Sequence, residues 1–170
     1  MVKLYTSLNV EQYSRVLKTK NLPLVSLGEN HLGLEFSEDK KYWVEALTNQ
    51  EDLDNVVDYK YSLIMEFEIK AEVLNSLIES TETGRFSQKI MDYHKAINKK
   101  TNISELKEAD TNVIVVLDAY ESDETHDGVS QKWMIRAKNE NSELWKSFLA
   151  GIHKLSCIGG IPGAIEEAKG

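Results

Sequence analysis

The stretch HLGLEFSEDKKYWVEAL, residues 31–47, decides the fold, because its hydrophobic period changes part-way along. Leu32, Leu34 and Phe36 alternate with other residues, which is typical of one face of a strand. Beyond Ser37, apolar residues recur at helical spacing. The stretch therefore predicts a strand that turns into a helix, with Ser37 as the helix cap and acidic residues in the first turn.

Outward from this corner, the same reasoning predicts a mixture of short strands and helices. At residues 9–12 the pattern Asn-x-x-Gln is an approximate capping box, which marks the start of a helix that ends near Asn21. Further strands are predicted over residues 3–8, 22–27, 61–69, 112–120 and 129–137, and further helices over residues 71–79, 86–98 and 142–155.

These elements alternate irregularly, which favours an α+β fold over a doubly wound sheet. We expect small mixed or antiparallel sheets of the split β-sandwich type with flanking helices. A chain of 170 residues is enough for one core, so residues 1–156 are predicted to form a single domain. The glycine-containing run IGGIPG lacks the Lys-Ser/Thr of a phosphate loop, and residues 157–170 are predicted to be a flexible tail.

The charge balance narrows the functional classes. Twenty basic against 28 acidic residues give a formal net charge of −8, which disfavours general nucleic-acid binding. One cysteine, Cys157, cannot form an intramolecular disulfide, and no export signal is recognised, so we expect a cytoplasmic protein. No apolar run approaches the roughly 18–20 residues that span a bilayer, so no membrane partner is expected.

Metal chemistry is not expected. The segment ESDETHDG, residues 121–128, imitates the opening of a calcium loop, but Met134 stands where the bidentate Glu is required. Cys157 has no nucleophile signature around it and is predicted to be an inert, buried thiol.

Gln131 breaks the pattern of its strand. It shares a face with Val129, Trp133, Ile135 and Ala137 and is the polar member of that row. A buried amide needs hydrogen-bond partners. Either Gln131 meets a polar partner inside the fold, or that end of the face opens into a cleft.

The order of the elements resembles the ADP-ribosyltransferase-like fold. The motifs that carry the resemblance are LYTS at residues 4–7, LEFS at residues 34–37 followed by EDKKYW, and SQKWMI at residues 130–135. The resemblance implies a pair of small sheets with NAD bound in the cleft between them, and it covers most of the chain.

The resemblance also implies a set of ligand-binding residues. Tyr5 or Thr6 would hold the nucleotide, Ser37 and Tyr42 would line the nicotinamide, and Gln131 would occupy the place of the catalytic Glu. Two features depart from the family pattern: residues 4–7 contain no Arg or His, and Gln131 carries no negative charge to stabilise a cationic transition state. The motif is therefore degenerate, and whether the chain is an enzyme stays open, with Gln131 the catalytic candidate.

The charge is also compatible with an alternative class of function. The chain would then be a non-catalytic acidic module, of the inhibitor or immunity type, that engages a basic protein partner. Its binding residues would be acidic side chains in two predicted loops: Glu51, Asp52, Asp54, Asp58, Glu121, Asp123, Glu124 and Asp127.

Overall fold

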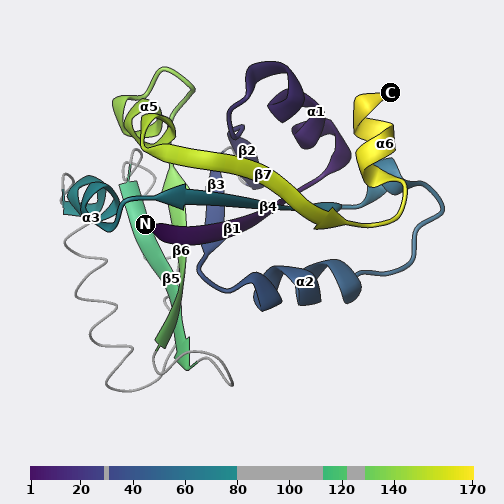
Figure 1. Ribbon diagram of the computed structural model, residues 1–170, viewed down its shortest axis with the longest axis horizontal. Coiled ribbons are helices and arrows are strands. Elements are labelled where there is room, and N and C mark those ends of the chain that lie inside the picture. The colour runs from purple at the N-terminus through teal and green to yellow at the C-terminus, as the bar shows by residue number, and fades with distance from the viewer. Residues whose placement is uncertain (29–30, 80–112, 122–128) are drawn as a thin grey trace.

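The structure is a computed structural model that describes residues 1–28, 31–79, 113–121 and 129–170 (Figure 1). The helix predicted over residues 86–98 and most of the loop at residues 121–128 lie outside these ranges.

The described elements alternate between strands and helices in the following order: β1 (Val2–Leu8), α1 (Val10–Thr19), β2 (Val25–Gly28), β3 (His31–Ser37), α2 (Lys40–Thr48), the 3₁₀ turn η1 (Val56–Asp58), β4 (Leu63–Ile69), α3 (Ala71–Glu79), β5 (Val113–Glu121), β6 (Val129–Arg136), α5 (Glu143–Ala150), β7 (Ile152–Gly160) and α6 (Ala164–Lys169).

The strands form one open antiparallel sheet in the order β5-β6-β3-β1-β4-β7, with β2 paired to β3 beside this path. The predicted α+β class is confirmed. Figure 1 shows that β1, β4 and β7 run across the view whereas β5 and β6 run steeply down it, so the two halves of the sheet cross one another.

The two halves meet at β3. One edge of β3 pairs continuously with β6, from Gly33 opposite Arg136 to Ser37 opposite Lys132. Its other edge is divided: β2 pairs with it up to Gly33, and β1 pairs with it at the single position Tyr5 opposite Ser37. Because β1 and β2 both lie along this edge and diverge from each other, the sheet splits beside Leu34 and Glu35.

The hydrophobic core lies on the face of the sheet that Leu4, Leu34 and Phe67 share, all at most 1% exposed. Phe36 is at its centre, with its ring centroid 5.3 Å from that of Phe148 in α5 and 6.0 Å from that of Phe67 in β4. The predicted periodicity of residues 61–69 is confirmed by this burial. That of residues 31–37 is confirmed at Leu34 and Phe36, whereas Leu32 is 37% exposed.

The helix starts differ in how they are capped. The predicted box at α1 is confirmed: the Asn9 side chain accepts from the Gln12 backbone N–H (2.8 Å), and the Gln12 side chain accepts from the Asn9 N–H (2.9 Å). At α2 the prediction is wrong, because the cap is Asp39, which accepts from the Lys41 N–H. Ser37 belongs to β3 and accepts from the Asp39 N–H at 3.0 Å, so it fixes the turn before the cap.

The C-terminal region also differs from the prediction. The helix expected over residues 142–155 ends at Ala150, and Ile152–Gly160 pairs with β4 as β7. Residues 157–170, expected to be a flexible tail, contain the end of β7 and α6, in which Ala164 and Ala168 are buried. The free edge of β4 supplies the strand partner, and such pairing overrides a local helical spacing.

Gly33 provides a test of the β2-β3-β6 packing. A Cβ atom at Gly33 would lie 2.0 Å from the Ile135 carbonyl oxygen and 2.7 Å from Leu27 Cδ1, so the backbone of β6 would have to move. We expect Gly33→Ala to lower the free energy of unfolding by at least about 2 kcal/mol, as measured by urea denaturation.

The matched control is Gly159→Ala in β7, where a Cβ atom meets nothing within 4 Å. This variant is expected to change the free energy of unfolding by less than about 0.5 kcal/mol. Equal effects of the two substitutions would contradict the close contact of β3 with β6.

Candidate functional site

A cavity of about 290 Å³ lies where the sheet splits, and we call it the split-sheet cavity. Its walls come from the end of β1, the start of α1, β2, the middle of β3, Trp43 of α2 and the residues just before β4. The lining combines side chains that can form hydrogen bonds, such as Asn9 and Gln12, with apolar ones, such as Val25 and Leu34. Such a combination is typical of small-molecule sites.

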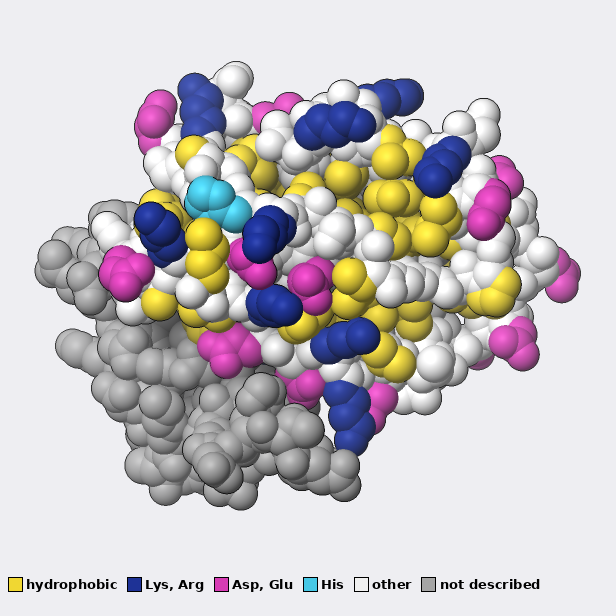
Figure 2. All heavy atoms as spheres, in the orientation of Figure 1, with side chains coloured by type: hydrophobic (Ala, Val, Ile, Leu, Met, Phe, Trp, Pro, Cys, Tyr) yellow, Lys and Arg dark blue, Asp and Glu magenta, His cyan; other side chains and the backbone are white. Residues whose placement is uncertain are grey.

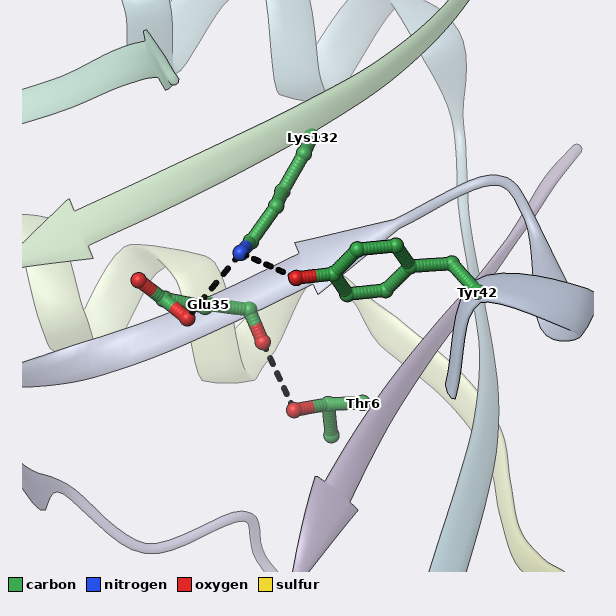
Figure 3. A network of polar contacts seen from close by, with 4 residues as sticks. All are labelled: Thr6, Glu35, Tyr42 and Lys132. Atoms are coloured by element: carbon green, nitrogen blue, oxygen red, sulfur yellow. Dashed lines mark hydrogen bonds and ion pairs between the residues drawn. The ribbon is translucent and has the colours of Figure 1, made fainter. Parts of the chain in front are cut away.

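Thr6, near the end of β1, lines the cavity. Its hydroxyl donates to the Glu35 carbonyl oxygen at 2.6 Å, at the place where β1 leaves β3. The Thr6 side chain therefore supplies the hydrogen bond that the Glu35 carbonyl would otherwise accept from the backbone of a neighbouring strand. Figure 3 shows this contact together with the side chains above it.

The segment before β4 is fixed by one amide. Gln50 Nε2 donates to the Tyr61 carbonyl oxygen (2.7 Å), and the Tyr61 N–H donates to Gln50 Oε1 (2.9 Å). The Ser62 N–H donates in turn to the Leu8 carbonyl oxygen at 2.9 Å. These bonds place Lys60 and Tyr61 beside the end of β1, and hence beside the start of α1.

Aromatic rings form one wall of the split-sheet cavity. Trp43 is 2% exposed, and its ring centroid lies 5.9 Å from that of Tyr61 in an edge-to-face arrangement. The indole Nε1–H of Trp43 is buried and finds no acceptor among the residues that the structure describes. A buried donor without an acceptor is costly, so this wall has unmet hydrogen-bonding capacity.

A charged network lies beside the cavity and ties α2 to the sheet (Figure 3). Lys132 Nζ donates to the Tyr42 hydroxyl at 2.6 Å and lies 3.4 Å from Glu35 Oε2. The same ammonium lies over two aromatic rings, 4.7 Å from the Tyr42 centroid and 5.8 Å from the Trp43 centroid. Strands β3 and β6 and helix α2 therefore meet at one cation.

The environment of Lys132 favours its charged form. Burial alone would lower its pKa, but the Glu35 carboxylate and the Tyr42 hydroxyl outweigh burial and raise the pKa above the ordinary 10.5. Lys132 is thus a structural cation whose charge is matched by Glu35.

The structure places the predicted ligand-binding residues around the junction of β1 and β3 without bringing them into one cavity. Thr6 lines the split-sheet cavity, whereas Tyr5 lines a separate open groove beside the start of α2. Ser37 is fully buried, and Tyr42 is bonded to Lys132. Gln131 pairs with Ala119 through its place in β6, and its side chain lies outside the described part.

Tyr5 has its own electrostatic setting. Burial, followed by the charge of Glu66 on the neighbouring strand, raises the pKa of the Tyr5 phenol. The raised pKa favours the neutral phenol, whose residue lines the groove beside α2.

The acidic residues predicted for a protein partner divide into two sets. Glu51, Asp52, Asp54 and Asp58 are exposed in the segment around η1, where Leu53 and Val57 are also exposed, at 43% and 42%. The other four fall outside the described side chains: Glu121, Asp123, Glu124 and Asp127. On the face seen in Figure 2, acidic and basic side chains are interspersed.

Several residues of the site were not identified from the sequence. Asn9 and Gln12 were recognised as a helix cap, but not as part of a cavity, and neither Lys60 nor Lys132 was singled out from the sequence. Alternation along β6 was the one available signal for Lys132, since it puts this residue on the face opposite Trp133.

Two features are not found within the described ranges. They contain no group of three or more His, Cys, Asp or Glu side chains arranged to hold a metal ion. Nor does any helix in them combine the length and apolar character that crossing a bilayer requires.

The Lys132 network makes a measurable contribution to stability. Lys132→Met leaves Glu35, whose side chain is 29% exposed, without its cation. We expect the free energy of unfolding at pH 7 to fall by about 1–3 kcal/mol. Because the folded-state pKa of Lys132 is raised, the contribution is present below pH 10.5 and is lost as the pH rises through the raised value.

The matched control for this prediction is Lys146→Met. Lys146 lies 3.9 Å from Glu143, with side chains 54% and 91% exposed, so its loss is expected to cost no more than about 0.5 kcal/mol. Denaturant unfolding of both variants at pH 7 and pH 11 makes the comparison. Equal destabilisation, or a Lys132→Met effect that grows at pH 11, would contradict the network.

Comparison with known proteins gives no family for this chain. No family model matches it, and neither a curated protein nor a solved structure matches it significantly. The geometry of the site is therefore the basis for a functional proposal.

Proposed function

We propose that this chain binds NAD or a related nucleotide in the split-sheet cavity. The observation that carries the proposal is the divided edge of β3, where the sheet opens into a cavity lined by Trp43, Tyr61 and hydrogen-bonding side chains. A nucleotide combines an aromatic base with hydroxyl and phosphate groups, and this lining offers a complementary surface to each. The resemblance to the ADP-ribosyltransferase-like fold points to the same ligand class.

The size of the cavity limits how much ligand it encloses. Its 290 Å³ is at the lower end of the roughly 300–1,000 Å³ of typical ligand pockets. It suits one nucleoside unit, so the second half of a dinucleotide would extend beyond it.

We propose binding rather than turnover. In the described part of the cavity lining the carboxylate is that of Glu35, and Lys132 neutralises it at 3.4 Å. A paired carboxylate is poorly suited to stabilise a cationic transition state. Gln131, at the place of the catalytic Glu in the resemblance, is neutral.

A second candidate function is supported by the surface around η1. There, Leu53 and Val57 are exposed between the acidic side chains Asp52, Asp54 and Asp58. Apolar anchors surrounded by charge are suited to a basic protein partner. Association with such a partner would slow steeply as salt is raised, and a rate that is independent of salt would contradict this candidate.

Nucleotide binding is tested by thermal unfolding in the presence of NAD. A ligand that binds only the folded state stabilises it by about 2.7 kcal/mol at a hundredfold excess over Kd. We expect a saturable rise in Tm for the wild type. Ser26→Phe should lose it, since Ser26 is an exposed residue of the cavity lining and a larger side chain there obstructs the cavity.

The matched control is Ser147→Phe, an exposed serine of α5 outside the cavity lining, which should keep the full shift. No shift up to millimolar NAD, AMP or ATP would overturn the proposal. A shift that Ser26→Phe leaves intact would place the ligand elsewhere on the chain.

A further inference from the structure

The charges in the lining of the split-sheet cavity are unbalanced. Among the described residues of the lining, the charged ones are Lys60 and Glu35. Glu35 is paired with Lys132 at 3.4 Å, whereas Lys60 has no carboxylate within ion-pair distance in the part of the chain that the structure describes. The cavity therefore offers one uncompensated positive charge, although the chain as a whole carries −8.

Two amide groups beside Lys60 have fixed orientations. In the capping box of α1 the oxygen of each side chain is occupied: Asn9 Oδ1 accepts from the Gln12 N–H, and Gln12 Oε1 accepts from the Asn9 N–H. Both residues line the cavity, and their NH₂ groups form no hydrogen bond to any described residue. The part of each of these two amides that remains for a ligand is therefore its NH₂ donor.

The backbone of α1 adds to this preference. The helix has ten residues and begins at Val10, directly after the cap. Its first turn carries a partial positive charge that favours an anion. An anion is thus favoured by three features at this end of the cavity: Lys60, the two amide NH₂ groups and the start of α1.

An independent observation comes from the aromatic wall. Trp43 lines the cavity and is 2% exposed, and its Nε1–H has no acceptor among the described residues. The wall of the cavity at Trp43 therefore holds a buried donor whose hydrogen bond is unmet among the described residues.

We infer that the α1 end of the split-sheet cavity is a phosphate-binding subsite, formed by Lys60 and the side-chain NH₂ groups of Asn9 and Gln12. The ligand is a phosphorylated nucleoside whose phosphate lies at α1 and whose base lies against Trp43 and Tyr61. The part of this inference that concerns the base rests on the proposed function, whereas the phosphate subsite does not.

The variant Gln12→Glu separates anion binding from folding. A glutamate at this position keeps the oxygen that accepts from the Asn9 N–H, so the capping box is preserved. It replaces the NH₂ donor by a negative charge, which repels phosphate. Lys60→Gln removes the cation, and Lys18→Gln, an exposed lysine of α1 outside the cavity lining, is the matched control.

The experiment is calorimetric titration of the full chain with adenosine, AMP and pyrophosphate. For the wild type and Lys18→Gln we expect AMP to bind at least about tenfold more tightly than adenosine, because hydrogen bonds to a charged group are strong. In Lys60→Gln and Gln12→Glu this advantage should fall to less than about threefold. Adenosine affinity should stay unchanged in all variants.

The outcomes separate the two proposals. If adenosine binds and NAD raises the Tm, but AMP has no advantage over adenosine or the advantage survives Lys60→Gln, the phosphate subsite is wrong and nucleotide binding stands. If pyrophosphate binds in a Lys60-dependent manner but no nucleoside does, the subsite stands and the nucleotide function is wrong. Binding of none of the three compounds would overturn both.

Discussion

The architecture depends on how one edge of β3 is shared. Its other edge is fully paired with β6, so the direction of β3 is set, and β1 can join it only at Tyr5 opposite Ser37 because β2 already occupies the first half of the edge. The crossing of the two halves of the sheet, the cavity beside Leu34 and Glu35 and the bond from Thr6 to the Glu35 carbonyl all follow from this division.

A single paired position is a weak junction, and side chains reinforce it. Phe36 packs its ring against Phe67 and Phe148 on the core face, while Lys132 connects Glu35 to Tyr42 on the opposite face. Apolar packing and a matched charge therefore hold the same strand from both sides. The charged side matters for the site as well, because it neutralises Glu35 and leaves Lys60 as the uncompensated charge among the described residues of the cavity lining.

Local patterns predicted the elements whose burial follows a simple period, such as β3 and β4, and the capping box of α1. They failed where distant partners decide. Residues 152–155 were predicted to continue the preceding helix, but they belong to β7, which pairs with the free edge of β4. The same reason limited the site. Thr6 was predicted from a resemblance, but Lys60 and Lys132 acquire their roles through residues far away in the sequence.

The capping box of α1 has a consequence for the thermodynamics of binding. Asn9 and Gln12 hold each other's conformation before any ligand arrives. Ordering a free, long polar side chain at an interface costs about 0.5–1.5 kcal/mol in rotamer entropy. Here that ordering takes place during folding, so two donors are already immobile when they meet a ligand. A feature that begins a helix thus also reduces the entropic cost of recognition.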